Sequence, residues 1–238
     1  MKILDLNIIC EDQIIPCQFK VIRMINAGYV GRDREAVKAH IEELRKEGVP
    51  HPPSVPMLFP VLSHNITTEN QIEVIGGKTS GEVEYVLLFD GEQIFVGVGS
   101  DHTDRNLERQ SITASKQICP NVLSQNVWKY EDVLPGWDDL VIQSWAKRAE
   151  KEKEILYQEA PLTSIISSTE ILDLAKSRII DRQYEGLVIF SGTVPILKNE
   201  IIYATNFRCE LTDFRLKRSL TCEYQIKCLD YLTGTESR

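Results

Sequence analysis

The sequence predicts a strand-rich protein of the α+β class, and three observations support this prediction. Short apolar runs recur from residue 3 to residue 228, and many of them alternate with polar residues and end at glycine, proline or aspartate. Helical periodicity with a capping residue is clearest over residues 34–48 and 167–175. Strands and helices do not alternate regularly, as they do in a protein built around a parallel sheet.

The N-terminal part is predicted to contain two strands, a helix and a connector. Residues 3–23 alternate between apolar and polar positions over two short stretches, which indicates a pair of strands. Asp33 is a suitable N-cap for a helix over 34–48, because an apolar stripe with helical spacing follows it. The prolines within residues 50–60 predict a rigid, extended connector.

The centre of the sequence predicts a strand followed by a tight hairpin. Residues 71–75 form the first strand, and an apolar run over 83–89 forms the second. Asp90 and Gly91 then supply a turn, and residues 93–99 return as the partner strand.

The rest of the chain continues the mixture of strands and helices. In chain order we predict a short helix over 107–115, a surface segment over 126–135, a strand over 140–145 that passes into a charged helix over 146–157, a capped helix over 167–175, a buried strand over 186–190 and further strands over 201–228.

Composition limits the classes of partner. The chain has 238 residues with 42% hydrophobic residues, enough for a sizeable core, and its net charge of −8 argues against nucleic acid as the main partner. No apolar run approaches the ~20 residues of a membrane helix, so no membrane association is expected. The six cysteines form no C-x-x-C pair, and Asp5 interrupts the apolar character of the N-terminus. We therefore expect a cytoplasmic protein.

Three carboxylates around the hairpin suggest a metal site. Glu82 and Glu84 lie two residues apart, so on a strand they share one face, and the return strand delivers Asp101 to the same end of the hairpin. Adjacent buried anions repel unless a cation lies between them, and an all-oxygen set suits Mg²⁺ or Mn²⁺. The alternative is a solvated strand face, which is the better explanation for Glu-x-Glu alone. The Gly97-x-Gly99-x-Asp101 pattern favours the metal.

A second candidate pair lies on the predicted N-terminal helix. His40 and Glu43 are three residues apart, so their side chains can meet on one helix face. The alternative is an ordinary surface ion pair.

The stretch from Gly99 to Glu108 resembles the Gly-Asn-Asp-x-Ser-x-Arg pattern of the fumarylacetoacetate hydrolase family, and the resemblance extends over residues 28–220. These enzymes act on 2-oxo and 2,4-dioxo acids with a divalent metal. The resemblance implies a mixed β-roll with a few flanking helices. It also implies Glu82, Glu84 and Asp101 as ligands of Mg²⁺ or Mn²⁺.

The resemblance implies roles for six further residues. His40 and Glu43 resemble the family's lid dyad, which activates water, and Lys116 resembles the lysine that lies over the developing enolate. Arg105 resembles a group that binds a substrate carboxylate. Gly192 and Thr193 resemble part of the family's Ser-Gly-Thr motif, which contacts the substrate. From the residues alone, the alternatives are that Lys116 is an ordinary exposed lysine and that Thr193 is a plain turn residue. His102 should point away from the site.

Some positions depart from the family pattern. The spacing between the acidic pair and Asp101 is short, Glu108 stands where the family has glutamine, and the Asn-Tyr pair expected before His40 is absent. We expect a shorter, divergent branch.

The resemblance completes the functional prediction. One domain spans residues 1–238, with N-terminal strands, lid helix and connector over 1–60 and a metal-binding core over 61–238. The implied activity is hydrolysis of a C–C bond in an oxo acid through a metal-chelated enolate. A hydratase, dehydratase or decarboxylase on the same site is the alternative, as is a non-catalytic metabolite-binding relative. A homodimer is expected from the family.

Overall fold

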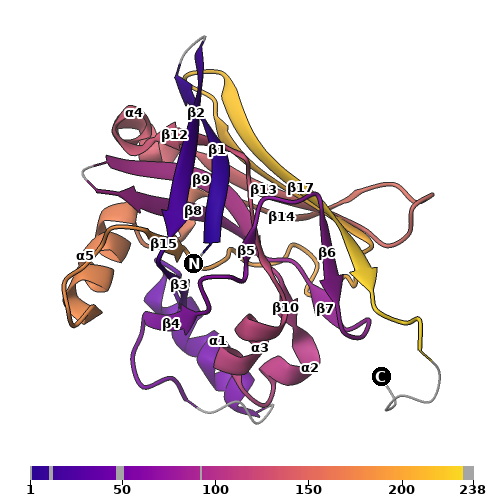
Figure 1. Cartoon of the computed structure of the whole chain (residues 1–238). Helices are drawn as coiled ribbons and strands as arrows, with labels where there is room; N and C mark the ends of the chain where they lie inside the picture. The colour runs from indigo at the N-terminus through magenta and orange to yellow at the C-terminus, as the bar shows by residue number, and fades with distance from the viewer. Residues whose placement is uncertain (1, 11–12, 47–50, 92, 233–238) are drawn as a thin grey trace.

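Two β-sheets organise the chain, with short helices at their margins (Figure 1). The computed structural model describes residues 2–10, 13–46, 51–91 and 93–232, without the side chains of His40 and Leu44. The predicted strand-rich α+β class is confirmed.

The larger sheet contains the predicted hairpin at its centre. Its strands are β1 (Lys2–Cys10), β2 (Gln13–Val21), β3 (Arg23–Gly28), β4 (Met57–Val61), β5 (Ile66–Thr67), β8 (Val83–Asp90), β9 (Gln93–Asp101), β11 (Asn121–Leu123), β12 (Asn126–Lys129) and β15 (Leu187–Phe190). The order across the sheet is β2-β1-β12-β9-β8-β15-β3-β4, and β11 joins β9 to β5. Gly91 in the β8–β9 turn has a φ of 59°, a left-handed conformation that glycine adopts at little cost.

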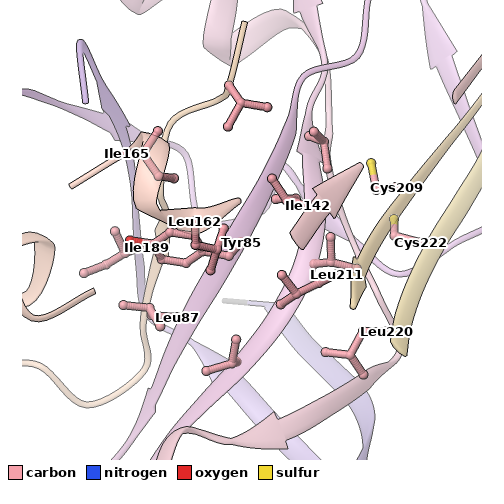
Figure 2. Packing of buried hydrophobic residues seen from close by; sticks show 14 of the residues in the cluster. Tyr85, Leu87, Ile142, Leu162, Ile165, Ile189, Cys209, Leu211, Leu220 and Cys222 are labelled. Carbon is pink, nitrogen blue, oxygen red and sulfur yellow. The ribbon is translucent and has the colours of Figure 1, made fainter. Parts of the chain in front are cut away.

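The smaller sheet packs against the central hairpin. It has the order β14-β13-β16-β17-β6, and a separate two-stranded sheet pairs β10 with β7. Their bounds are β6 (Gln71–Val74), β7 (Thr79–Ser80), β10 (Thr103–Asp104), β13 (Val141–Lys147), β14 (Ile155–Pro161), β16 (Asn206–Asp213) and β17 (Arg218–Cys228). Figure 2 shows part of the shared core, in which Tyr85 and Leu87 of β8 belong to one buried cluster with Ile142, Leu211 and Leu220 of the smaller sheet.

The helices are α1 (Arg34–Lys46), α2 (Arg105–Glu108), α3 (Ile112–Ile118), α4 (Tyr130–Val133) and α5 (Ser168–Arg178), with 3₁₀ turns at Leu134–Asp139 and Leu162–Ser164. The predicted caps are confirmed. Asp33 Oδ1 accepts hydrogen bonds from the first turn of α1, and Ser167 and Glu170 form a capping box at α5. The predicted end of the first helix, Gly48, lies outside the described residues. In Figure 1, α1, α2 and α3 gather at one end of the larger sheet.

The prediction of a surface segment over 126–135 is wrong for its first part, whereas Glu131, Leu134 and Pro135 are exposed. Residues 126–129 form β12, which pairs with both β1 and β9, and Trp128 is fully buried. The guanidinium of Arg218 lies 4.5 Å from the centre of the Trp128 ring. The acidic residues nearby suggested solvent exposure, but the pairing of distant strands decides the burial of this segment.

The prediction of a helix over 146–157 is also wrong. β13 continues through Ala146 and Lys147, where it pairs with β16, and the chain then turns back into β14 from Ile155. The charged residues between the strands form the hairpin connection. Their helix propensity is a weak local preference, and strand pairing on both sides overrides it. Within the described part of the chain, no helix has the length and apolar character needed to cross a membrane.

Candidate metal centre

The β8–β9 hairpin brings three carboxylates together. Glu82 immediately precedes β8, Glu84 lies within β8, and Asp101 ends β9. The antiparallel register places the start of β8 opposite the end of β9, and Asp101 N donates to Glu82 O at 3.0 Å. One oxygen from each side chain can be chosen so that all three lie within 4.8 Å of one another. The residues assigned to a metal from the sequence are therefore neighbours, and their role as ligands stays a prediction.

Two of these carboxylates are buried. Glu84 is 1% exposed and Asp101 is 0% exposed. Burial raises the pKa of Glu84 well above its usual value, and the nearby Asp101 raises it further. Burial also raises the pKa of Asp101, although Lys116 opposes this effect. The site therefore holds negative charge in a place where negative charge is disfavoured without a cation.

Each carboxylate is held by a partner from the chain. Lys116 Nζ forms an ion pair with Asp101 Oδ2. Arg105 Nη2 donates to Glu82 Oε1 at 2.9 Å, and Gly192 N donates to Glu84 Oε2 at 2.8 Å. Partners of this kind fix the orientation of carboxylates before a metal binds.

The donor chemistry fits a hard divalent cation. Asp101 Oδ1 is buried and has no hydrogen-bond partner among the described residues, whereas Oδ2 of the same carboxylate is held by Lys116. A buried oxygen without a partner is costly unless something binds it. Three carboxylates without a thiol or imidazole donor match the preference of Mg²⁺ and Mn²⁺. The residues present therefore fit the predicted metal.

Lys116 is a buried part of this centre. It lies in the last turn of α3 and is 5% exposed, so the alternative of an exposed surface lysine is wrong. Burial alone would lower its pKa, but the surrounding carboxylates outweigh burial and raise the pKa above its usual value. Without a bound cation, these carboxylates therefore favour the protonated form of Lys116.

Arg105 binds the chain's own carboxylates in this structure. Its side chain is 10% exposed, and it donates to Ser80 Oγ at 2.7 Å, Glu108 Oε2 at 2.8 Å and Glu82 Oε1. Glu108, which departs from the family pattern, thus supplies a second anion for this guanidinium. Asp104 caps α2, because its side chain accepts hydrogen bonds from Asn106 N and Leu107 N. The predicted role of Arg105 in binding a substrate carboxylate stays a prediction.

Gly192 and Thr193 contact the hairpin directly. Gly192 has a φ of 82°, and an added Cβ would lie 2.6 Å from Val30 Cγ2, so only glycine fits beside Glu84. Thr193 Oγ1 donates to Val83 O at 2.9 Å and accepts from Gln158 Nε2 at 2.7 Å. The Thr193 hydroxyl therefore holds β8 in place, and its predicted substrate contact is untested.

One family model matches most of the chain. The family model described as "Protein of unknown function (DUF2848)" matches residues 27–224. The chain belongs to this family. A search of curated proteins found no match to this DUF2848 chain.

Solved structures share the fold of the DUF2848 chain. A 2-keto-3-deoxy-D-arabinonate dehydratase complexed with magnesium and 2,5-dioxopentanoate aligns with a TM-score of 0.62 at 13% identity, covering 92% of this chain and 85% of that one. A 5-carboxymethyl-2-hydroxymuconate delta-isomerase from Mycobacterium smegmatis aligns with a TM-score of 0.61 at 12% identity, covering 90% and 80%. A 2-hydroxyhepta-2,4-diene-1,7-dioate isomerase from Mycobacterium marinum aligns with a TM-score of 0.62 at 13% identity, covering 92% and 82%. The predicted fumarylacetoacetate-hydrolase-like fold is confirmed.

The sequence analysis did not identify Gln158, whose side chain holds Val83 of β8 and Thr193 in place. Its side chain is 1% exposed, accepts from Val83 N at 3.1 Å and Ser144 Oγ at 2.9 Å, and donates to Thr193 Oγ1 and Val194 O. Gln158 is followed by Glu159 in β14, so no local pattern in the sequence distinguished it. It lay just beyond the stretch that was wrongly predicted to be a helix.

His102 of the DUF2848 chain points away from the metal centre, as expected. One ring nitrogen lies 2.9 Å from the Tyr224 hydroxyl, and the other lies 2.9 Å from the Thr79 hydroxyl. Burial lowers the pKa of His102 to about 3, and the positive charge of Arg105 contributes. His102 is therefore a neutral, hydrogen-bonded core residue rather than a ligand.

The predicted lid dyad lies on α1 of the DUF2848 chain. The backbone of His40 is helical, but its side chain lies outside the described part of the structure. Glu43 has an exposed side chain. The pairing of His40 with Glu43 therefore stays a prediction.

Proposed function

We propose that this chain is a divalent-metal-dependent enzyme that acts on a small 2-oxo acid. The observation that carries the proposal is the group of three carboxylates within 4.8 Å, two of them buried. A site of this kind is expensive to maintain unless a cation fills it. The similar dehydratase structure that contains magnesium and 2,5-dioxopentanoate supports both the metal and the substrate class.

The proposed roles follow from the contacts. Glu82, Glu84 and Asp101 would hold the metal. When bound, the metal supplies a Lewis acid that stabilises negative charge on the oxo acid. The surrounding carboxylates favour the protonated form of Lys116, in which it can stabilise a developing negative charge or donate a proton but cannot act as a base.

A base must therefore come from another residue. His40 is the candidate, because imidazole titrates near neutral pH and Glu43 lies three residues away on the same helix. C–C hydrolysis requires this base to activate water. Dehydration or isomerisation requires it to remove a proton beside the oxo group.

Two reaction classes are therefore proposed for the same residues. The first is the C–C hydrolysis implied by the family resemblance. The second is dehydration or isomerisation, and the names of the similar structures favour it. Comparing the rates of turnover of 2,4-dioxo acids and of 3-deoxy-2-oxo acids would separate the two classes. C–C hydrolysis predicts turnover of the former, and dehydration predicts turnover of the latter. A homodimer in the cytoplasm remains part of the proposal.

Metal-dependent stabilisation tests the proposal. The melting temperature of the wild type should rise with Mg²⁺ or Mn²⁺ and rise further when oxalate or pyruvate is added. Glu82→Ala and Asp101→Ala should abolish both increases. Glu35→Gln on the exposed surface of α1 is the matched control and should keep them. If the wild type gains no stability from metal or oxo acid, the three carboxylates do not form the proposed site.

If the metal binds but no oxo acid is turned over, the non-catalytic alternative holds. In that case metal affinity would be retained, and His40→Ala would leave the binding of oxo acids unchanged.

A further inference from the structure

Tyr29 has an unusual backbone conformation next to the metal centre. Its φ is 57°, in the left-handed region that a bulky side chain seldom adopts. Among the described residues, the other non-glycine positions with positive φ are Arg182, Asn199 and Lys217, and all three are exposed. Tyr29 differs because it is half-buried and directly follows β3. Strained residues of this kind concentrate at functional sites.

The residue before Tyr29 connects it to Lys116. Gly28 packs against the Phe59 ring so closely that an added Cβ would lie 2.9 Å from Phe59 Cε2. The ammonium of Lys116 lies 5.8 Å from the centre of the same ring. The Phe59 ring is therefore next to both Gly28, the residue before Tyr29, and the ammonium of Lys116.

The residue after Tyr29 connects it to Glu84. Val30 is 3% exposed, and its methyl groups occupy the space where a Cβ on Gly192 would lie. Gly192 N in turn donates to Glu84 Oε2. The two neighbours of Tyr29 in the sequence therefore lead to the metal centre. Gly28 contacts Phe59, which lies near Lys116, and Val30 contacts Gly192, which donates to Glu84.

The electrostatic surroundings of the Tyr29 hydroxyl agree with this placement. Burial raises its pKa, Glu108 raises it further, and Lys116 lowers it. Two charged groups that border the three carboxylates therefore act electrostatically on the hydroxyl. No hydrogen bond joins this hydroxyl to another described residue, so it is available to a ligand.

We propose that Tyr29 is a substrate-binding residue: its side chain borders the metal centre beside Lys116 and Glu108, and its hydroxyl binds an oxygen of the oxo acid that the metal would not hold. The proposal rests on the proposed function, because it needs an oxo acid at the metal. It assigns to this chain a preference for oxo acids that carry a further oxygen, such as a 4-oxo group.

Two ligands separate the role of Tyr29 from that of the metal. Oxalate can chelate the metal but has no 4-oxo group, whereas 2,4-dioxopentanoate can also chelate the metal and carries a 4-oxo group. Their affinities would be measured by calorimetry at saturating Mg²⁺ for the wild type, Tyr29→Phe and Tyr29→Gly. The Phe variant removes only the hydroxyl, so it carries the test if the Gly variant does not fold. Lys217→Gly is the matched control, because it relieves a left-handed residue in an exposed turn between β16 and β17.

We expect Tyr29→Phe to weaken 2,4-dioxopentanoate roughly three- to tenfold, the effect of one lost hydrogen bond. Tyr29→Gly should weaken it further, because the ring is also lost. Oxalate and Mg²⁺ affinities should be unchanged in both variants, and Lys217→Gly should match the wild type with both ligands.

Other outcomes overturn the proposal in distinguishable ways. If the wild type binds both acids and the Tyr29 variants bind 2,4-dioxopentanoate as tightly, Tyr29 does not contact substrate, although the proposed function stands. If the variants lose oxalate and 2,4-dioxopentanoate equally, Tyr29 supports the metal centre rather than recognising the substrate. If the wild type binds neither acid in the presence of metal, the proposed function falls and the role of Tyr29 falls with it.

Discussion

Glu84→Gln should stabilise the protein when no metal is present. Glu84 is 1% exposed and lies close to the carboxylates of Glu82 and Asp101. Glutamine has almost the same shape, and its side-chain oxygen can still accept the hydrogen bond from Gly192 N. The substitution therefore removes a buried negative charge without removing its packing.

The magnitude follows from the distances. At about 4.8 Å and an effective dielectric constant of about 20, two like charges repel by roughly 3–4 kcal/mol. The attraction of Lys116 for Glu84 offsets much of that repulsion, and the desolvation of a buried carboxylate costs several kcal/mol more. We expect the free energy of unfolding of metal-free Glu84→Gln to exceed that of the wild type by about 1–3 kcal/mol near pH 8.

The gain should depend on pH in a defined direction. The pKa of Glu84 is raised in the folded protein, so the wild type pays no penalty below the unfolded pKa of about 4.3. The penalty grows as the pH rises from the unfolded pKa towards the folded pKa, because the unfolded chain loses this proton while the folded protein keeps it. The difference between variant and wild type should therefore be larger at pH 8.5 than at pH 5.5.

Urea unfolding in EDTA at these two pH values measures the difference. Adding Mg²⁺ should then stabilise the wild type more than Glu84→Gln, since the variant has lost a ligand. Glu185→Gln, at an exposed position, should behave as the wild type throughout. A loss of more than about 1 kcal/mol in metal-free Glu84→Gln at pH 8.5, or an undiminished response to Mg²⁺, would refute the electrostatic reasoning.

Three further predictions concern the surroundings of the site. The folded pKa of His102 is about 3, below the unfolded value of about 6.5, so the free energy of unfolding should fall by up to about 1.4 kcal/mol per unit as the pH drops through this range. His102→Gln should flatten this slope in urea titrations at several pH values, whereas a change at the exposed His64 should not. Gly192→Ala should cost more than about 1 kcal/mol by urea unfolding and weaken metal binding by calorimetry, because its φ is 82° and its Cβ would collide with Val30. Lys116→Met should lose about 3–5 kcal/mol in EDTA by leaving Asp101 without its cation, and Mg²⁺ should raise its melting temperature more than that of the wild type.

The sequence was informative where local patterns determine structure. A hairpin with an Asp90–Gly91 turn needs only adjacent residues, so the position of Asp101 opposite Glu82 could be predicted from the chain alone. The caps of α1 and α5 are also local contacts and were predicted correctly.

The errors arose where distant segments decide the outcome. Trp128 is buried because β12 lies between β1 and β9, and neither neighbour is close to it in sequence. The charged run after Lys147 forms a connection between strands because β13 pairs with β16, some sixty residues away. The burial of Lys116 and the hydrogen bonds of Gln158 depend on the same long-range packing. A polar residue gains such partners only after the sheets have assembled.

The charge balance of the assembled site favours a divalent cation over a single additional lysine. Four carboxylates, those of Glu82, Glu84, Asp101 and Glu108, surround the cationic side chains of Arg105 and Lys116, which leaves a formal charge of −2. Arg105 divides its charge between Glu82 and Glu108, so the presence of Glu108 leaves less of that charge for the three clustered carboxylates. The remaining deficit is concentrated at Glu84, whose chain partner is the neutral Gly192 amide, and at the unpaired oxygen of Asp101. A divalent ion between these oxygens would cancel the excess charge and satisfy the orphaned oxygen together.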